Sequence, residues 1–367
     1  MKNKKIIHVT SYYPPHLGGQ ENYVKIVTNK LAKNGWDIDV FTSDIGTKNK
    51  KPVFSYNHRV FYLKSIDIAH TPIIFLLLIK LLINPKPALI HLHVAQAFSP
   101  EIVYLVSKLR RIPYIAHIHS DVEPTGKYGF LLEPYKRMFL KHVLRNSTKI
   151  ICLSDSQKKI IAKKYGISHG KIIALRNGVD DAYFSKRLIN KKDIPTILFV
   201  GRLGVLKNIP RLIKAVSLMK IAVQLRIVGE GEDRTTIEET IKDLKLSNVT
   251  LVGKKTGVEL INEYKNADVL VLPSDREGGA PLVVLEALAT GLPVVISEIY
   301  GIRELLGDAV LLVKNHTSEN FAIALDNLLS DINLQKSLSN KGEEIIENFR
   351  WKNIILDMEN IYKEVLL

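Results

Sequence analysis

Short runs of apolar, mostly β-branched residues alternate along the whole chain with longer segments whose apolar residues recur at helical spacing. Strands buried on both faces and joined by crossover helices produce this pattern, so it predicts parallel sheets of the α/β class. In the first half we predict strands at residues 5–10, 38–42, 60–63, 89–93, 114–119, 149–153 and 172–176. In the second half we predict strands at residues 196–201, 224–228, 249–252, 269–272, 294–296 and 310–313.

The predicted strands fall into two groups, which favours two doubly wound domains over one (β/α)8 barrel. Residues 180–195 between the groups lack a continuing apolar period and are rich in charged and amide side chains, so we expect the domain boundary there. We assign residues 1–186 to the first domain and 187–350 to the second. Residues 351–367 carry apolar side chains at helical spacing and predict a helix that closes back toward the first domain.

Composition places the chain among globular proteins, because 46% of its 367 residues are hydrophobic and 24% are charged. The single cysteine, Cys152, lies in an apolar strand sequence and indicates packing in a reducing compartment. The apolar run at residues 6–9 is too short for a signal peptide. Residues 73–83 are the most apolar stretch and fall short of the roughly 20 residues that a membrane span needs. We therefore predict a buried or interfacial helix at 73–83 in a cytoplasmic protein.

The net charge of +15 is confined to one half of the chain. Residues 1–190 hold 30 Lys and Arg against 12 Asp and Glu, whereas residues 191–367 hold 22 against 25. A one-sided charge of this kind indicates an anionic bilayer, a nucleic acid or a phosphate-bearing acceptor as partner. The alternative is a solvated surface that is rich in lysine and has no such partner.

Two loops offer groups that suit phosphate. Gly18 and Gly19 precede a predicted helix, where a bare backbone and free N–H groups allow an anion to approach closely, although a plain loop is equally compatible. The third glycine of the dinucleotide-binding fingerprint is missing. Arg202 and Lys207 follow the first strand of the second domain, where a guanidinium and an ammonium suit a diphosphate. Two ordinary surface cations are the alternative.

A third loop, at residues 273–281, joins a strand to a helix that begins near Pro281. Backbone N–H groups from Gly278 to Leu282 are suited to an anion or to sugar oxygens, and Glu277 reaches in from the loop. Glu286 lies among apolar neighbours, where a carboxylate needs a hydrogen-bonding partner such as a ribose diol. A partly exposed helix glutamate is the alternative.

An ordered set of motifs resembles the family-4 glycosyltransferases, or glycosyl transferases group 1, most strongly over residues 172–313. The motifs are Gly18-Gly19, Asn177-Gly178-Val179-Asp180, Gly201-Arg202 with Lys207, Val228-Gly229-Glu230-Gly231, and Pro273-Ser274 followed by a loop with two glutamates. The resemblance implies a retaining enzyme of the GT-B fold, in which two Rossmann-like domains face each other across a cleft. The first domain would bind the acceptor and the second the nucleotide-sugar donor.

The resemblance also implies roles for single residues. Arg202 and Lys207 would bind the donor diphosphate, and Gly18 and Gly19 would close over it. The other donor contacts would come from Val252 and Lys254 at the nucleobase, Glu286 at the ribose, Glu277 at the sugar, and Gly278, Gly279, Ala280, Pro281 and Leu282 through their backbone. His119 would lie near the sugar, with His117 on the same strand face as the alternative. His91 and His93 would line the acceptor cleft or be structural histidines.

One spacing departs from the family pattern, because eight residues separate Glu277 from Glu286 where the family has seven. The expected activity is transfer of a hexose from a UDP- or GDP-sugar to a glycan or lipid-linked acceptor, with retention, in cell-surface polysaccharide or glycolipid synthesis. No metal or other cofactor is expected, since no Asp-x-Asp ends a strand and no His/Asp cluster has metal-ligand spacing along the sequence.

The basic first half and the apolar stretch at 73–83 indicate a peripheral position on the inner face of an anionic membrane. The rival functions are an epimerase or hydrolase of the nucleotide sugar, a nicotinamide-dependent dehydrogenase, and a basic nucleic-acid-binding protein. The dehydrogenase fingerprint and a nucleic-acid recognition motif are both missing from the sequence, so we expect no nucleic-acid partner.

Overall fold

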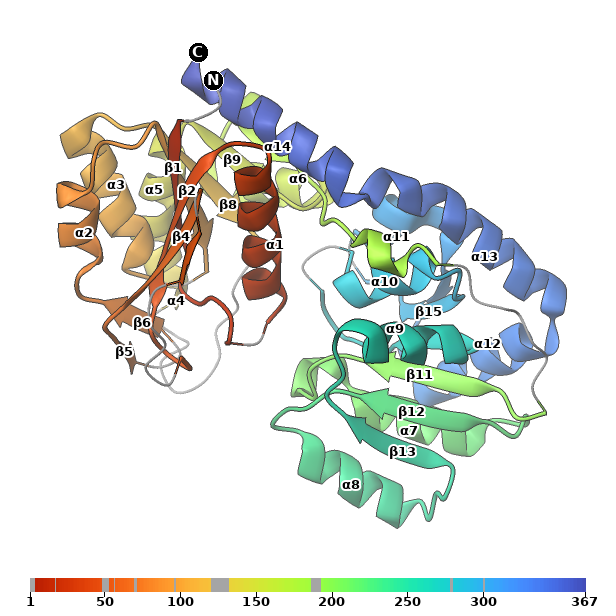
Figure 1. Cartoon of the computed structure of the whole chain (residues 1–367). Helices are drawn as coiled ribbons and strands as arrows, with labels where there is room; N and C mark the ends of the chain where they lie inside the picture. The colour runs from red at the N-terminus through yellow and green to blue at the C-terminus, as the bar shows by residue number, and fades with distance from the viewer. Residues whose placement is uncertain are drawn as a thin grey trace. The chain divides into compact units, whose positions relative to one another are not determined.

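The computed structural model divides the chain into two compact units (Figure 1). Unit 1 comprises Met1–Arg176 with Ile354–Leu367, and unit 2 comprises Asn177–Asn353. The structure describes residues 4–16, 18–47, 53–55, 57–68, 71–95, 97–119, 132–185, 193–277, 280–299 and 301–367.

Unit 2 begins earlier in the chain than the boundary at residue 186 that we expected from composition. Asn177 Nδ2 donates to the Ala280 carbonyl at 3.4 Å, and Val179 forms a parallel β-bridge with Arg350. These tertiary contacts tie the first residues of unit 2 to its own loops.

Unit 1 is built on an eight-stranded sheet in the order β10-β9-β8-β7-β1-β2-β4-β3. All neighbours pair in parallel except β3, which is antiparallel to β4 at the edge. The strands are β1 (Lys5–Val9), β2 (Asp37–Ser43), β3 (Val53–Ser55), β4 (His58–Leu63), β7 (Leu89–Val94), β8 (Tyr114–Ile118), β9 (Lys149–Cys152) and β10 (Ile172–Ala174). A separate hairpin joins β5 (Ser65–Ile68) to β6 (Thr71–Ile74).

Helices cover both faces of this sheet, as doubly wound sheets require (Figure 1). One face, carrying Ile7, Ile90 and Ala116, packs against α2 (Leu77–Ile83), α3 (Ser99–Arg110) and α5 (Lys141–Asn146). The alternate residues of the same strands point to the opposite face, where α1 (Gly19–Lys33) lies. The unit also contains α4 (Leu132–Tyr135), α6 (Asp155–Tyr165) and most of α14 (Trp351–Leu366).

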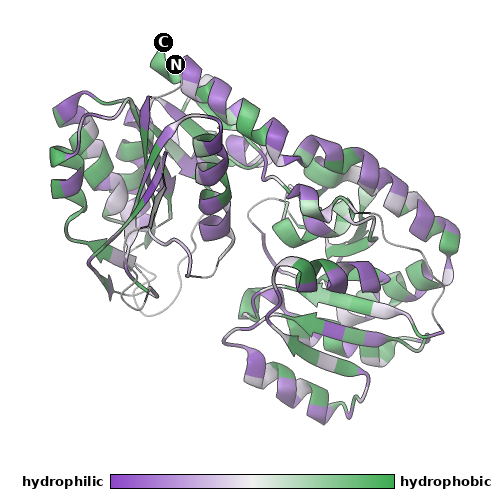
Figure 2. Cartoon of the chain, viewed as in Figure 1, coloured by the Kyte–Doolittle hydropathy of each residue, from purple (hydrophilic) through white to green (hydrophobic). Residues whose placement is uncertain are grey.

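Unit 2 is built on six parallel strands in the order β13-β12-β11-β14-β15-β16, and these strands are mainly hydrophobic (Figure 2). The strands are β11 (Thr196–Val200), β12 (Gln224–Val228), β13 (Val249–Gly253), β14 (Val269–Leu272), β15 (Val294–Ser297) and β16 (Leu311–Val313). The helices are α7 (Ile209–Leu218), α8 (Arg234–Asp243), α9 (Gly257–Asn266), α10 (Leu282–Ala289), α11 (Ile302–Leu306), α12 (Ser318–Ser330) and α13 (Ile332–Ile346). This is the α/β architecture that the hydrophobic pattern predicted.

Every predicted strand and the predicted helix at the chain end are confirmed, with ends that differ by a residue or two. The single helix predicted over residues 73–83 is wrong in its first part. Ile73 and Ile74 belong to β6, where they pair with Ile66 and Ser65, and helix α2 begins only at Leu77. The β-branched residues favour extended backbone, and the neighbouring strand supplies the hydrogen bonds.

Candidate active site

The strand order of unit 2 creates one position where two loops leave the sheet in opposite directions. β11 lies between β12 and β14, and the chain extends outward from this pair on both sides. Ligands of doubly wound sheets bind at such a switch point, beyond the carboxyl ends of the strands. The loops after β11 and β14 carry Arg202, Lys207 and Glu277.

These two loops are bound to each other by a small polar network. Asp275 N–H donates to the Leu206 carbonyl at 3.0 Å, and Asn208 Nδ2 donates to Asp275 Oδ2 at 3.0 Å. Arg211 Nη1 donates to Asp275 Oδ1 at 2.6 Å and to the Pro273 carbonyl at 2.9 Å. Sequence reasoning missed Asp275 and Arg211, because their pairing depends on β11 and β14 being neighbours.

Lys207 and Glu277 form an ion pair at this switch point. Lys207 Nζ lies 2.5 Å from Glu277 Oε1, and the side chains are 25% and 11% exposed. The family resemblance implied donor contacts for both residues, and the structure brings their side chains into direct contact. The Lys207 ammonium group is therefore held beyond the carboxyl ends of β11 and β14. An anionic ligand that binds there would compete with Glu277 for it.

Arg202 lies apart from this pair. Its side chain is 70% exposed, and its Nε lies 3.0 Å from Glu232 Oε2. An exposed ion pair of this kind contributes little to stability, so the guanidinium is available to a ligand at small cost. Glu232 was not singled out from the sequence.

The glycines after β12 permit a close backbone approach. Gly229 has φ 150°, and a Cβ on it would lie 1.8 Å from the Gly201 carbonyl oxygen. A Cβ on Gly231 would lie 2.2 Å from the Leu203 carbonyl oxygen. The Gly-Glu-Gly motif therefore lets the loop after β12 pack directly on the loop that carries Arg202.

Glu286 is held by two tyrosines. Tyr264 donates its hydroxyl to Glu286 Oε2 at 2.7 Å, and Tyr183 also hydrogen-bonds to the carboxylate. Burial raises the pKa of Glu286 to about 7, although both tyrosine bonds act in the opposite direction. Glu286 is half-buried, and the carboxylate that the sequence placed among apolar neighbours thus has protein partners already. Neither tyrosine was identified from the sequence.

The remaining predicted donor residues lie at the same edge of the sheet. Val252 is half-buried in β13, and Lys254 follows this strand on the surface. Ala280 is buried, and Pro281 immediately precedes α10, which begins at Leu282. Gly278 and Gly279 lie outside the described residues, as does part of the unusual spacing between Glu277 and Glu286.

The two glycines before α1 in unit 1 have different surroundings. A Cβ on Gly18 would lie 2.1 Å from Glu21 Oε2, so Gly18 leaves room for the Glu21 carboxylate, which pairs with His16 at 2.9 Å. At Gly19, no described atom lies within 4 Å of the Cβ position. Nothing in the described structure therefore requires Gly19 to lack a side chain.

Five histidines of unit 1 gather on one sheet face. His8 comes from β1, His91 and His93 from β7, and His117 from β8, which His119 directly follows. All five are buried, and their rings stack with centroid distances from 4.1 to 5.5 Å. Sequence reasoning placed His117 and His119 on one face, which is confirmed, but it missed His8.

Burial keeps these imidazoles neutral. It lowers the pKa of His8 and of His119 to about 3, and it lowers the pKa of His91, His93 and His117 well below the usual 6.5. The positive charge of the first half of the chain was counted from Lys and Arg alone, and these neutral rings add nothing to it.

Nitrogen atoms of the cluster lie within 4.8 Å of one another in two groups of three, His8 with His91 and His93, and His93 with His117 and His119. Sequence spacing did not reveal this proximity. A metal ion needs lone pairs that converge, and each lone pair lies in its ring plane. Within the two groups the ring planes are only 12° to 30° apart and the rings are stacked, so the lone pairs do not point to a common centre.

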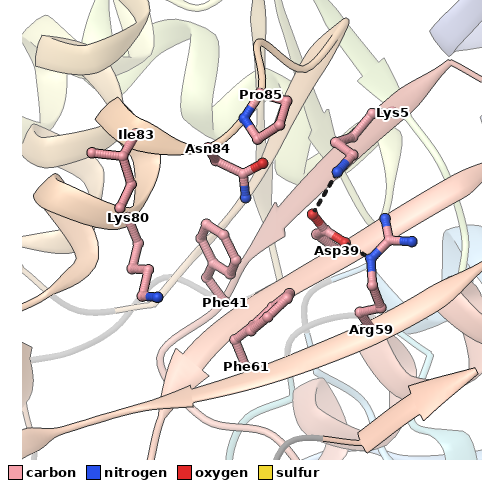
Figure 3. Close-up of a pocket in the computed structure, with 9 residues that line it drawn as sticks. All are labelled: Lys5, Asp39, Phe41, Arg59, Phe61, Lys80, Ile83, Asn84 and Pro85. Carbon is pink, nitrogen blue, oxygen red and sulfur yellow. Dashed lines mark hydrogen bonds and ion pairs between the residues drawn. The ribbon is translucent and has the colours of Figure 1, made fainter.

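A pocket in unit 1 lies toward the amino-terminal ends of β1, β2 and β4, at the edge of the sheet opposite to the carboxyl ends of the strands (Figure 3). Phe41, Phe61 and Ile83 form its apolar wall. Three of its charged side chains are paired with one another, since Asp39 accepts from Lys5 Nζ at 3.2 Å and from Arg59 Nε at 2.5 Å, and Lys80 is the fourth charged residue of the lining. The pocket therefore lies away from the carboxyl ends of the strands, where reacting groups are expected.

Two family models match consecutive parts of the chain. Residues 17–183 match Glycosyltransferase Family 4, and residues 180–345 match Glycosyl transferases group 1. The chain belongs to glycosyltransferase family 4. This membership favours a transferase over the dehydrogenase alternative.

Curated relatives match this family-4 chain over most or nearly all of its length. An uncharacterised glycosyltransferase of Methanocaldococcus jannaschii is 29% identical, with 98% of each chain covered. The O-antigen biosynthesis glycosyltransferase WbnH of Escherichia coli is 28% identical, covering 97% of this chain and all of that protein. A UDP-Gal:α-D-GlcNAc-diphosphoundecaprenol α-1,3-galactosyltransferase of Escherichia coli is 29% identical over 78% of this chain and 76% of its own.

Solved structures show that the fold is GT-B. Sucrose-phosphate synthase from Thermosynechococcus elongatus matches with a TM-score of 0.80 at 23% identity, covering 99% of each chain. HepE of Anabaena, solved with UDP-glucose, matches with a TM-score of 0.79 at 16% identity, covering 99% of this chain and all of that one. Among the described helices, none combines the length and the apolar character of a membrane-spanning segment.

Proposed function

We propose that this glycosyltransferase moves a hexose from a UDP- or GDP-sugar to a glycan or lipid-linked acceptor with retention of configuration, in cell-surface polysaccharide or glycolipid assembly. The observation that carries the proposal is the ion pair between Lys207 and Glu277 at the switch point of unit 2. The relatives add weight, since one is named for O-antigen synthesis and another for galactosyl transfer to a diphosphoundecaprenol acceptor.

The chemistry assigns a role to each cation. As the bond between the sugar anomeric carbon and the phosphate oxygen breaks, its electron pair leaves with the nucleoside diphosphate. Lys207 and the exposed Arg202 stabilise that growing charge by electrostatic preorganisation. The acceptor hydroxyl forms the new bond on the same face of the sugar, and its proton passes to the departing phosphate. In this proposal the two cations take the place of a divalent metal.

The remaining residues hold the donor. Glu286 accepts hydrogen bonds from the ribose hydroxyls, and Tyr264 fixes the orientation of its carboxylate. Val252 and Lys254 flank the nucleobase, and backbone N–H groups before and at the start of α10 contact the sugar and a phosphate. Glu277 turns toward the sugar when the diphosphate takes over Lys207. In unit 1, the open space above Gly19 admits a phosphate, and His119 lies near the sugar.

The acceptor side of the proposal rests on a surface of unit 1 that we name the α2–α3 surface. Its exposed apolar residues are Phe75, Leu76, Ile79, Leu82, Ile83, Leu105 and Leu109, and its exposed cations are Lys86, Lys108 and Arg111. Figure 2 shows α2 as a largely hydrophobic helix. Arg110 joins the two helices by donating to the carbonyls of Leu81 and Asn84 at 2.6 and 2.8 Å. Apolar side chains among cations suit an anionic bilayer, where each Lys or Arg contributes about 1 kcal/mol.

Product analysis tests the donor side. The protein is incubated with a panel of UDP- and GDP-hexoses, with and without a polyprenyl-diphosphate-linked sugar acceptor, in the presence of EDTA. We expect a glycosylated acceptor with the donor's anomeric configuration, read by NMR. Free sugar or an epimer formed equally well without acceptor would favour a hydrolase or epimerase, and loss of transfer in EDTA would contradict metal independence.

Vesicle flotation tests the membrane partner. We expect binding to phosphatidylglycerol vesicles at low salt, weaker binding at high salt, and none to phosphatidylcholine vesicles. Ile83→Glu should abolish binding. Ile323→Glu is the matched control, because Ile323 is a similarly exposed apolar residue on α12 of unit 2. Wild-type protein that fails to float with anionic vesicles at low salt would overturn this part of the proposal.

A further inference from the structure

We propose that Tyr362 is a positioning residue, which closes one hydrogen-bonded chain through all five buried histidines and thereby sets the ring tautomer of His119. The effect on catalysis rests on the role given to His119 in the proposed function. The hydrogen-bonded chain itself rests only on contacts within unit 1.

The chain can be followed from ring to ring. His119 Nε2 lies 3.0 Å from His93 Nδ1, and His93 Nε2 lies 3.0 Å from His8 Nδ1. A second, shorter run has His91 Nε2 at 3.1 Å from His117 Nδ1. The hydroxyl of Tyr362 joins the two runs.

Tyr362 bonds to one histidine of each run. Its oxygen lies 3.3 Å from His8 Nε2 and 2.6 Å from His91 Nδ1. The hydroxyl is fully buried, as are both rings. It comes from helix α14 at the end of the chain, whereas the histidines come from β1, β7 and β8.

The chemistry of neutral imidazole gives this chain a direction. Each neutral ring has one N–H donor and one bare acceptor nitrogen, and a hydroxyl donates once while accepting. Every link joins an Nδ1 to an Nε2, or one of them to the hydroxyl. If every link is satisfied, all protons point the same way, so the five rings share one tautomer, either all Nδ1–H or all Nε2–H.

The two ends of the chain differ. His117 Nε2 is buried, and within the described part of the protein it has no hydrogen-bond partner. Among the residues that the structure describes, the hydrogen-bonded chain therefore stops at His117 and offers no exit for a proton there. At the other end His119 is 8% exposed, more than the other four rings. The arrangement thus suits orientation of His119 and not conduction of protons through the unit.

Removing the Tyr362 hydroxyl separates the two runs. In Tyr362→Phe, His8 and His91 each lose a partner, and the run that ends at His119 is no longer tied to His117. Tyr114→Phe is the matched control, because Tyr114 is also a buried tyrosine of unit 1 whose hydroxyl donates to the backbone carbonyl of Val143. Both variants lose one buried hydroxyl, but only Tyr362→Phe breaks the chain.

Nitrogen NMR of the full chain, labelled with 15N at histidine, reads the tautomers directly. We expect the five exchange-protected rings to share one tautomer in the wild type and in Tyr114→Phe, and to show mixed tautomers in Tyr362→Phe. The wild-type spectrum alone tests the chain, so the result survives a variant that does not fold. Mixed tautomers in the wild type would overturn the proposal.

Steady-state kinetics test the positioning role. We expect Tyr362→Phe to lower kcat by roughly tenfold, with the donor KM unchanged within about twofold, because a misplaced group costs rate more than binding. Tyr114→Phe should retain the wild-type kcat. Altered tautomers with an unchanged kcat would overturn the positioning role. If the wild type transfers no sugar at all, the proposed function fails, but the NMR result still decides whether the chain exists.

Discussion

The two units use polar groups inside similar sheets in opposite ways. In unit 1 five neutral imidazoles are buried side by side, and each forms at least one hydrogen bond with a neighbouring ring or with Tyr362. In unit 2 the switch point carries ionised groups in pairs, such as Lys207 with Glu277, and α10 adds the half-buried carboxyl group of Glu286. Burial lowers the pKa of a base and raises that of an acid, so acid should act on the two units with opposite sign.

The units also differ in net charge. Unit 1 holds 29 Lys and Arg against 13 Asp and Glu, whereas unit 2 holds 23 against 24. Among the described Lys and Arg residues of unit 1, only Lys136 is buried, and the buried histidines stay neutral. The surplus therefore belongs mainly to the surface of unit 1, which is where a partner would meet it.

The largest expected effect is acid destabilisation of unit 1. Unfolded histidines bind protons below pH 6.5. Burial lowers the pKa of folded His8 and His119 to about 3 and the pKa of folded His91, His93 and His117 well below 6.5, so the free energy of unfolding falls as pH drops below 6.5. At pH 5.5 each buried histidine lowers the free energy of unfolding by about 1.4 kcal/mol, and the cluster together lowers it by several kcal/mol. Glu286 instead favours folding of unit 2 by about 2 kcal/mol on the same acidification from pH 7.5.

Pulsed hydrogen exchange measures both units in one sample. The protein is equilibrated in urea at pH 7.5 and at pH 5.5, labelled at a single pH, and read by peptide mass. Peptides of unit 1 should lose protection at lower urea at the acidic pH, and peptides of unit 2 should not. An equal loss of protection in both units would contradict the opposite responses to acid that we expect of them.

The next largest effect concerns Glu286 alone. Its pKa in the folded protein is about 7 against an ordinary 4.5, so its stabilising contribution is complete below pH 4.5 and is lost as pH rises through 7. The loss amounts to about 3 kcal/mol. Glu286→Gln should remove this dependence in urea titrations of unit 2 at pH 5 and pH 8. The exposed Glu259 supplies the control, Glu259→Gln, which should keep the wild-type dependence.

A third prediction tests the charged switch point of unit 2. Lys207→Ala should lower kcat/KM by about 10- to 100-fold, since one charge-assisted bond to the leaving phosphate contributes about 1.5–3 kcal/mol. Arg226→Gln is the control, because Arg226 pairs with Glu263 at 2.7 Å and the two side chains are 35% and 13% exposed, similar to Lys207 and Glu277. An equal loss of kcat/KM in both variants would mean that breaking any ion pair of unit 2 lowers activity, and would contradict a specific role for Lys207.

The smallest effect on stability is expected at Gly19 of unit 1. A methyl group there meets no described atom within 4 Å, and glycine in a helix costs up to about 1 kcal/mol relative to alanine. Gly19→Ala should therefore keep or slightly raise the melting temperature while lowering turnover, because the methyl group occupies the path of the phosphate. Gly170→Ala, at a glycine with equally open surroundings, should leave turnover unchanged. Full activity in Gly19→Ala would contradict the proposal that a phosphate binds next to Gly19.

Most of the fold could be predicted because its signals are local. Continuous β-branched runs mark buried parallel strands, and all the predicted ones are present. Three strands were not predicted, namely β3, β5 and β6. They are short and lie outside the doubly wound pattern. Helical hydrophobicity at residues 73–83 was misleading, because pairing with β5 decided the state of Ile73 and Ile74.

The candidate site also contains residues that could be predicted from local sequence and residues that could not. Arg202, Lys207 and Glu277 could be found from the sequence, because each stands just after a strand and parallel strands bring their carboxyl ends to one edge. Their partners could not, since Asp275, Arg211 and Tyr264 become neighbours only through the order β12-β11-β14 and the helix packing of unit 2.

The α/β class, the two large sheets, the concentration of charge in one half and the cations after the first strand of unit 2 can all be predicted from the residues alone. The tertiary structure alone decided that Lys207 meets Glu277, and that five histidines and Tyr362 form one cluster. His91 and Tyr362 are 271 residues apart in the chain. Such contacts depend on strand order and crossover packing, which are set by the burial of whole sheet faces and leave no mark on the residues near either partner.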